Sequence, residues 1–322
     1  VLNYAQGDFI HECERQLAVS GQIRLCVLKA RQIGISTVIE AIAFVLSIMF
    51  DDMHTLIISH EKKSSEAILD MTKRYWSTFI FKEMHTERYN GKNQLSWFDT
   101  GSNIEVVTAK NVDAGRSMTI HILHASEVAF WPEPEVLMTG LAQSIPTFGL
   151  TAVFLESTAN GLGNYFHKMC TEAMRGDNDY AFKFYPWHQH PEYTATHIPT
   201  DKREKYAIVD KLDDEEQWLS TTYKLPIERL VWRRWAIANK CQGSLDKFHQ
   251  EYPSTPHEAF VSTGRNVFSL PAMLRHYQPR KGRRGVLQRR SNKVEFVPHE
   301  DGWLTLFSYP SPDKNWGIYV AE

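Results

Sequence analysis

The residues with the clearest chemistry lie in one short stretch, from Lys29 to Thr37. An apolar run at residues 25–28 precedes the stretch, and residues 38–46 follow it with the composition of a buried helix. A strand that enters a tight loop at a helix N-terminus presents free backbone N–H groups to an anion, and the helix dipole also favours negative charge there. The order of strand, loop and helix therefore predicts a phosphate-binding loop.

This loop departs from the usual signature, GxxxxGK[ST], in which lysine reaches the phosphates and Ser or Thr holds Mg²⁺. Lys29 stands where the first glycine is usual, and Ile35 stands where the lysine is usual, while Gly34 and Ser36 keep their places. The charge, the glycine and the hydroxyl for Mg²⁺ are thus all present in a variant arrangement. The expected nucleotide-binding residues of the loop are Lys29, Ala30, Arg31, Gln32, Ile33, Gly34, Ile35, Ser36 and Thr37.

Two further candidate residues, Ser126 and Glu127, directly follow the apolar run at residues 119–125. A strand that carries a carboxylate to a nucleotide is the second half of a phosphate-loop NTPase, and Glu127 would accept a proton from the attacking water or orient it. An Asp usually precedes such a Glu and supports Mg²⁺. Ser126 stands there instead and can hydrogen-bond a metal-bound water, as can Glu127. The alternative is an ordinary strand with an acidic end, and the phosphate loop upstream favours the catalytic interpretation.

Two further polar groups could serve the same site. The apolar run at residues 153–157 leads to Thr158 and Asn160, and polar residues at the carboxyl end of a strand lie where doubly wound sheets bind ligands. They could sense the γ-phosphate, although a strand-to-helix turn capped by Asn and Gly explains them equally well. Gln6, upstream of the loop, offers a donor and an acceptor to an adenine edge, a role that few surface glutamines have.

Composition limits the class of protein. The chain has 322 residues and 43% hydrophobic residues, which excludes a disordered chain and suggests one large or two medium domains. The net charge of -2 gives no global basic field, so a nucleic-acid partner would need a local patch or a ring of subunits. The apolar run at residues 41–50 is too short to span a bilayer, and we expect no membrane partner.

The strongest basic run covers residues 280–284 and continues at Arg289, Arg290 and Lys293. It either contacts a phosphate backbone or forms a solvated hairpin, and the residues alone leave both open.

Taken in order, these motifs resemble the large terminase subunit of tailed bacteriophages, the ATPase that packages DNA into procapsids. Residues 29–36 (KARQIGIS) resemble that family's deviant Walker A motif, and residues 124–131 (HASEVAFW) its Walker B region. Residues 157–161 (STANG) resemble its coupling motif. Residues 251–253 (EYP) and 258–260 (EAF) resemble a stretch common in prophage terminases.

The resemblance implies an α/β fold with a RecA-like (ASCE) P-loop NTPase core, a mainly parallel sheet flanked by helices, and a small second subdomain. It places the core at residues 1–187 and the smaller lid or linker subdomain at 188–310. Residues 311–322 then resemble the opening strand of an RNase H-like nuclease that is absent from this chain.

The resemblance also implies ATP and Mg²⁺ as cofactors, and double-stranded DNA, a portal protein and the small terminase subunit as partners. It implies a homo-oligomeric ring, a pentamer on the portal, in the host cytoplasm during virion assembly and not in the mature virion. The family uses an arginine finger, for which Arg31 in cis and Arg116 in trans both match. The rival interpretations are a helicase-like or other DNA-translocating NTPase, and a nucleotide-binding switch with little turnover.

Overall fold

The computed structural model describes residues 2–111, 115, 118–207, 212–261, 283–290, 293–299, 304–308 and 318–321. The chain divides into two compact units, Val1–Arg265 and Asn266–Glu322, which are described separately below. The boundaries expected after residues 187 and 310 do not coincide with this division. The reason is packing: Leu219, Val231 and Phe248, from the helical segment after residue 187, share one hydrophobic core with the first strand and its helices.

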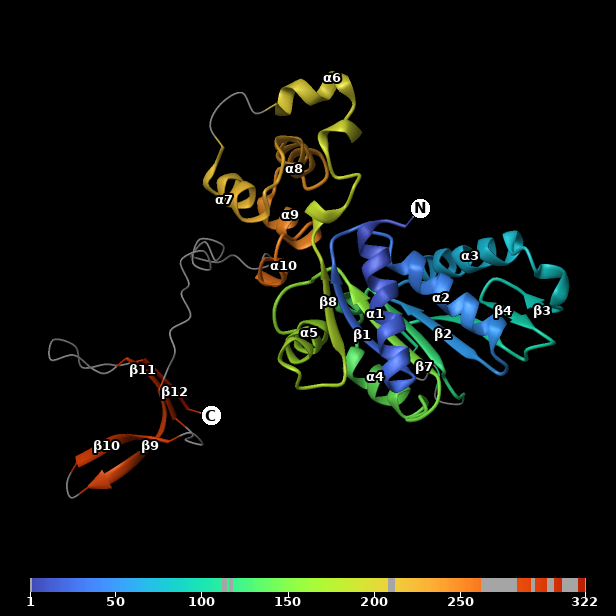
Figure 1. Cartoon of the computed structure of the whole chain (residues 1–322), viewed down its shortest axis with the longest axis horizontal. Helices are drawn as coiled ribbons and strands as arrows, with labels where there is room; N and C mark the ends of the chain where they lie inside the picture. Colours follow the sequence, from blue (N-terminus) through green and yellow to red (C-terminus); the bar gives the residue numbers. More distant parts are fainter. Residues whose placement is uncertain are drawn as a thin grey trace. The chain divides into compact units, whose positions relative to one another are not determined.

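The first unit is built on an eight-stranded sheet with the order β3-β4-β5-β2-β6-β7-β1-β8 (Figure 1). Six neighbouring strands run parallel, and two strands at one edge pair antiparallel. All seven residues of β7 are buried, as expected for a parallel strand covered on both faces. The strands are β1 (Gln22–Lys29), β2 (His54–Ser59), β3 (Glu87–Asn90), β4 (Gln94–Trp97), β5 (Asn103–Thr108), β6 (Ile122–Ser126), β7 (Thr151–Ser157) and β8 (Ala181–Tyr185).

Helices cover both faces of this sheet. Along β1, Leu25 and Val27 pack in one cluster with residues of α1 and α2, while Cys26 and Leu28 pack in the other with residues of α4 and α5. This alternation follows from the two-residue period of a strand. The mainly parallel sheet flanked by helices is therefore confirmed. The helices are α1 (Tyr4–Ser20), α2 (Ile35–Met49), α3 (Lys62–Thr78), α4 (Pro134–Ala142) and α5 (Tyr165–Arg175), with short 3-10 turns η1 (Lys82–Met84) and η2 (Val128–Phe130).

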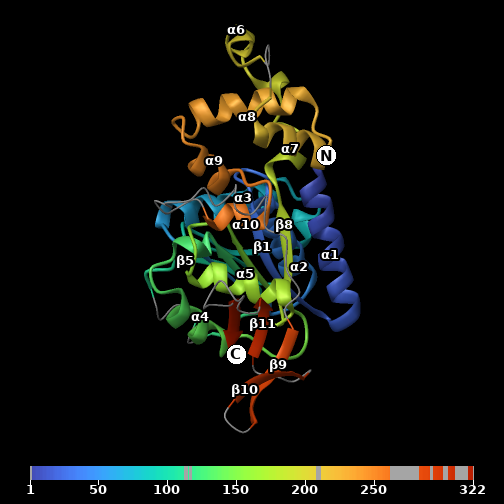
Figure 2. The same cartoon turned by 90° about the vertical axis from the view of Figure 1, so that its left-hand side faces the viewer.

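A group of short helices follows β8 and gathers beyond one end of that strand (Figures 1 and 2). An aromatic stack packs within the group, with the ring of Trp232 stacked 5.4 Å from Trp187 and 4.3 Å from Tyr193. The sequence pattern predicts helices over residues 212–222 and 226–240, and the structure confirms both as α7 and α8. The group comprises η3 (Trp187–Gln189), η4 (Ala195–His197), α6 (Thr200–Arg203), η5 (Glu204–Tyr206), α7 (Asp214–Tyr223), α8 (Ile227–Asn239), α9 (Leu245–Glu251) and α10 (Pro256–Val261).

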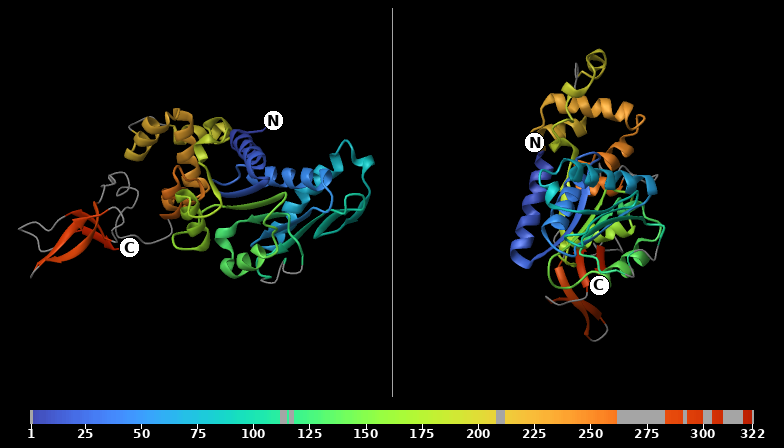
Figure 3. Two further views of the ribbon diagram at one scale, coloured as in Figure 1. Left: turned by 60° about the horizontal axis from the view of Figure 1, so that its bottom comes forward. Right: turned by 90° about the vertical axis from the view of Figure 1, so that its right-hand side faces the viewer.

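The second unit holds a four-stranded antiparallel sheet with the order β10-β9-β11-β12, coloured orange to red in Figure 3. Its strands are β9 (Arg283–Arg290), β10 (Lys293–Pro298), β11 (Leu304–Ser308) and β12 (Ile318–Ala321). The basic run thus continues into a hairpin, β9–β10, in which Arg283 and Arg284 are exposed. The segment expected to open a further domain contains β12, which pairs with β11 inside this sheet.

Within the described ranges, none of the helices combines the length and the apolar character that a membrane crossing requires.

Candidate functional site

The loop between β1 and α2 has the backbone that a phosphate-binding loop needs. Gly34 caps α2 in the left-handed region, with φ 84°, and a Cβ placed there would lie 2.6 Å from the side-chain nitrogen of Gln6. Both conditions favour glycine at this position. Because Gly34 brings no side chain to cap the helix, the N–H groups of the first turn of α2 are left for a ligand.

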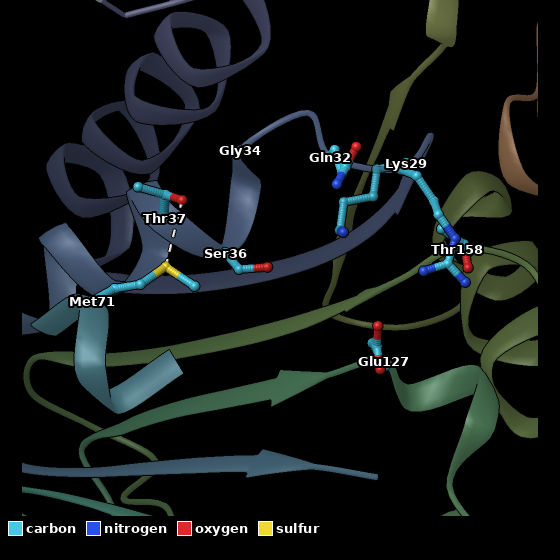
Figure 4. Close-up of a pocket in the computed structure, with 9 residues that line it drawn as sticks. Lys29, Gln32, Gly34, Ser36, Thr37, Met71, Glu127 and Thr158 are labelled. Atoms are coloured by element: carbon cyan, nitrogen blue, oxygen red, sulfur yellow. Dashed lines mark hydrogen bonds between the residues drawn. The ribbon is translucent and has the colours of Figure 1, made fainter. Parts of the chain in front are cut away.

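A cavity of about 380 Å³ lies against this loop, at the carboxyl ends of β1, β6 and β7. Figure 4 shows that the loop provides one wall and that Glu127 and Thr158 face it from the neighbouring strand ends. The Thr37 hydroxyl lies 3.6 Å from the sulfur of Met71, which closes another side. The lining residues are Lys29, Arg31, Gln32, Gly34, Ser36, Thr37, Met71, Glu127 and Thr158. Segments far apart in the sequence, from the loop to the coupling motif, thus meet in one place.

A fully buried carboxylate, Glu156 on β7, lies behind the loop. The Lys29 Nζ is 3.0 Å from its Oε2. Its Oε1 accepts hydrogen bonds from the hydroxyls of Ser36 at 2.7 Å and Ser126 at 2.8 Å. The Glu156 carboxylate therefore connects the displaced lysine, the hydroxyl expected to hold metal and the serine that replaces the Walker B Asp.

The connection continues into the core through His124. Its ring lies between two carboxylates, with Nε2 3.3 Å from Glu156 and Nδ1 2.6 Å from Glu40. Burial lowers the pKa of His124, but the hydrogen bonds to both carboxylates outweigh it and raise that pKa to about 9. Burial raises the pKa of Glu156, but Lys29 and His124 together hold it well below its usual range. Thr72 completes the network by donating a hydrogen bond to Glu40 at 2.6 Å.

Glu127 follows β6 directly and adopts the left-handed conformation, with φ 56°. A left-handed backbone is uncommon for residues other than glycine, and such strain concentrates at functional sites. The carboxylate pairs with His60, with 2.5 Å between Glu127 Oε2 and His60 Nδ1, and both side chains are about one-third exposed (33% and 28%). Glu127 therefore lies at the cavity wall, beside an imidazole from the end of β2.

Arg31 is tied to α9 rather than directed freely into the cavity. Its guanidinium makes a bidentate ion pair with Glu251, and its N–H donates to the Glu251 carbonyl at 2.9 Å. Its own carbonyl accepts a hydrogen bond from the Tyr193 hydroxyl. These contacts brace the phosphate loop against the helical group that follows β8.

Residues 157–161, which resemble the coupling motif, contact helix α9 and residues 124–131, which resemble the Walker B region. The Gln250 side chain donates to the carbonyl of Ala159 at 3.0 Å, and Asn160 donates to the carbonyl of Ala129 at 3.1 Å. Thr158 lines the cavity, whereas Asn160 is exposed beside it. Gln250 and Glu251, adjacent on α9, therefore contact the coupling motif and the phosphate loop respectively.

Other expected site residues have different positions. The Gln6 side chain donates to the Gly34 carbonyl at 3.0 Å and accepts from the Asn3 N–H, so its amide anchors α1 to the loop. Ala30, Ile33 and Ile35 are buried in the core behind the loop. Arg116 lies outside the described residues.

Sequence reasoning missed several groups at this site: Glu40, His60, His124, Glu156 and Glu251. A signal existed for two of them. Glu40 and Glu156 are acids inside otherwise apolar segments, and a charged residue is almost never fully buried unless it is paired. No comparable signal links Glu251 to Arg31, because 220 positions separate them.

A separate group of possible metal ligands lies among the short helices. Ligand atoms of Glu215, His249 and Glu258 all lie within 4.8 Å of one another. Arg233 already approaches Glu215, at 2.7 Å between Nη2 and Oε1, and supplies positive charge there. We interpret this group as a buried ion-pair network that holds α7, α9 and α10 together.

Comparisons with known proteins support the fold. No family model and no curated protein matches the chain. Among solved structures, the HK97 bacteriophage large terminase is similar over 99% of this chain, with a TM-score of 0.54 and 13% identity. This likeness shows a shared fold and confirms the predicted RecA-like core. The chain spans 62% of that terminase's length.

Two weaker likenesses are to large terminases of thermophilic phages. The Thermus phage P74-26 large terminase ATPase domain matches with a TM-score of 0.40 and 16% identity, over 63% of this chain and 89% of that one. The large terminase of another thermophilic bacteriophage, in complex with ATP-gamma-S, matches with a TM-score of 0.47 and 9% identity, over 66% of this chain and 50% of that one.

Proposed function

We propose that this chain is the ATP-hydrolysing motor portion of a phage large terminase, which drives double-stranded DNA into a procapsid. The observation that carries the proposal is the cavity itself. It brings a phosphate loop, a carboxylate after a strand and a coupling-type threonine to one edge of a parallel sheet. Ligands of open α/β sheets bind at this edge.

In this proposal the loop binds the phosphates of ATP. Lys29 and the N–H groups at the start of α2 face the cavity and supply positive charge and donors to the anion. The site also fits Mg²⁺, which prefers oxygen ligands, since the Ser36 hydroxyl and the Glu156 carboxylate lie together there. Ser36 would hold the metal, with Ser126 or Glu127 acting through water, and bound Mg²⁺ would neutralise charge on the β- and γ-phosphates.

Glu127 is the proposed catalytic residue. Its carboxylate lies on the cavity wall opposite the loop, where it would orient the attacking water and accept its proton. The imidazole of His60 lies against that carboxylate. The arginine finger is Arg116 or Arg31, and the ion pair of Arg31 with Glu251 favours a bracing role for Arg31. Gln6 would approach the adenine, and its present bonds to Asn3 and Gly34 place it next to the loop.

Movement would be transmitted through Thr158 and Asn160 to the helical group. Thr158 lines the cavity, and the adjacent Ala159 carbonyl accepts a hydrogen bond from Gln250 of α9. The proposed partners are DNA, the portal and the small terminase subunit, with a pentameric ring formed in the host cytoplasm during assembly and absent from the mature virion. The exposed Arg283 and Arg284 of β9 are candidates for phosphate-backbone contact.

The test is phosphate release from ATP by the purified chain, alone and with double-stranded DNA and procapsids. We expect Mg²⁺-dependent turnover that DNA or procapsids stimulate and that the Glu127→Gln variant lacks. Failure of the chain to bind or hydrolyse ATP under all of these conditions would contradict the proposal. Strand separation on a forked duplex without procapsids would instead identify a helicase-like translocase.

A further inference from the structure

The strand that carries Glu127 lacks the acid that usually supports Mg²⁺, and the neighbouring strand provides one. Ser126 ends β6, and it pairs in register with Glu156 on β7. The Ser126 hydroxyl donates to Glu156 Oε1 at 2.8 Å. The carboxylate of Glu156 therefore lies directly in front of the position that the missing Asp would occupy.

The same oxygen also reaches the phosphate loop. Ser36, on the first turn of α2, donates its hydroxyl to Glu156 Oε1 at 2.7 Å. In phosphate-loop NTPases the metal is held between this hydroxyl and the acid of the neighbouring strand. Glu156 Oε1 thus lies between the two points that define the metal position in such a site.

We propose that Glu156 takes the metal-supporting role of the absent acid and, together with Ser36, holds the Mg²⁺ of the bound nucleotide. This inference rests on the proposed function, because it assigns a residue to the metal of the same nucleotide site. It also gives Ser126 a definite part, which is to orient the Glu156 carboxylate rather than to support the metal itself.

Charge balance supports the assignment. Glu156 is completely buried, and the nearest cations are Lys29, at 3.0 Å, and His124, at 3.3 Å. His124 is shared with Glu40, which is equally buried. When phosphates compete for Lys29, the Glu156 carboxylate loses its main partner, and a buried carboxylate needs another cation. A divalent metal that binds together with the nucleotide would supply that positive charge as Lys29 turns to the phosphates.

The plain alternative is that Glu156 only stabilises the core. Glu40 offers a matched control, because it is also fully buried and also accepts a hydrogen bond from His124, but it does not contact Ser36 or Lys29. If the loss of either carboxylate damages the site in the same way, Glu40→Gln and Glu156→Gln will show the same change in Mg²⁺-dependent ADP binding. If Glu156 supports the metal, the two variants will differ.

The experiment compares the affinity for ADP with Mg²⁺ and with EDTA, by isothermal titration calorimetry on the full chain. In the wild type and in Glu40→Gln, we expect Mg²⁺ to tighten ADP binding about tenfold or more, the scale on which supporting ligands change metal affinity. In Glu156→Gln, we expect that gain to disappear, while affinity in EDTA stays equal or rises because Lys29 is released. Retention of the full gain in Glu156→Gln would overturn the inference.

A second variant covers the case in which Glu156→Gln does not fold. The double substitution Ser126→Asp with Glu156→Ser moves the carboxylate to the usual strand and keeps the charge. We expect it to restore the Mg²⁺ gain and to bind one Mn²⁺ per ATP-gamma-S, counted by electron paramagnetic resonance. A folded double variant with no gain would overturn the inference. A wild type that binds no ADP with or without Mg²⁺ would instead reject the proposed function.

Discussion

The ion pair of Arg31 with Glu251 connects the phosphate loop to α9, and its strength can be measured with a double-mutant cycle. The result distinguishes a bracing role of Arg31 from a catalytic one. The perturbation is Arg31→Ala and Glu251→Ala, singly and together. The Arg31 guanidinium makes two hydrogen bonds to the Glu251 carboxylate, one of them 3.0 Å between Nη2 and Oε1. The backbone bond between the same residues, at 2.9 Å, involves neither side chain, so the cycle isolates the side-chain pair.

The coupling free energy between Arg31 and Glu251 can be estimated from the geometry of the pair and its exposure to solvent. Hydrogen bonds between charged groups contribute about 1.5–3 kcal/mol when they are well shielded from water. The Arg31 side chain is 47% exposed and that of Glu251 is 23% exposed, so solvent screens the pair. We therefore expect a coupling free energy of about 1 kcal/mol between the two side chains in the cycle.

The assay is urea denaturation of the four proteins, together with the ATPase rate of each. If Arg31 only braces the loop, both single variants lose similar stability, and their rates fall together by a modest factor. If Arg31 leaves Glu251 to act on the γ-phosphate, Arg31→Ala alone loses about 1,000-fold or more in rate while Glu251→Ala stays near the wild type. That split, or a coupling free energy near zero, would refute the bracing interpretation.

Four other outcomes follow from the site and its surroundings. The pKa of His124 is raised from 6.5 to about 9, so its contribution to stability is complete below pH 6.5 and is lost as the pH rises through about 9. Urea denaturation at a series of pH values should show this decline in the wild type and not in His124→Gln. An equal pH dependence of the free energy of unfolding in both proteins would contradict it. Burial raises the pKa of Glu258 from 4.5 to about 7, so the free energy of unfolding should decrease as the pH rises from about 4.5 to about 7. The Glu258→Gln variant should not show this decrease, and a decrease that persists in the variant would contradict the assignment. Gly34→Ala should lose about 1–2 kcal/mol of stability in thermal denaturation, because φ there is +84°, and an unchanged melting temperature would oppose this. Lys29→Met should weaken ADP binding by about tenfold or more in calorimetry, since charged hydrogen bonds contribute at least about 1.5 kcal/mol; wild-type affinity would remove Lys29 from the phosphate site.

Local patterns predicted the centre of the fold well. The apolar run before Lys29, the glycine at position 34 and the apolar helix after it specify β1, the loop and α2 as observed. Residues 95–98 and 104–108 flank the turn residues 99–102 and so predict a hairpin, which the structure confirms as β4 and β5, paired antiparallel. The sequence also predicts a helix over residues 62–81, and in the structure this helix, α3, ends earlier, at Thr78. These elements depend on short-range periodicity and turn residues, which a single sequence displays directly.

The candidate site was predictable where residues follow strand ends, and not where partners come from distant segments. Ser36, Glu127 and Thr158 share a cavity because the carboxyl ends of parallel strands meet at one edge. The pairing of Arg31 with Glu251 depends on the packing of α9, which no local pattern encodes. The local pattern places Glu156 in an apolar strand but does not identify the buried partners that an acid inside such a strand requires.

We propose that ATP is hydrolysed in the cavity beside Lys29 and that Glu127 activates the attacking water. The most direct measurement is a comparison of wild type and Glu127→Gln for two quantities, the dissociation constant for Mg-ATP-gamma-S and the single-turnover rate of ATP hydrolysis. We expect the dissociation constant to be preserved and the rate to fall by about 100- to 10,000-fold, the range of general-base catalysis. A hydrolysis rate in Glu127→Gln that matches the wild type would contradict it.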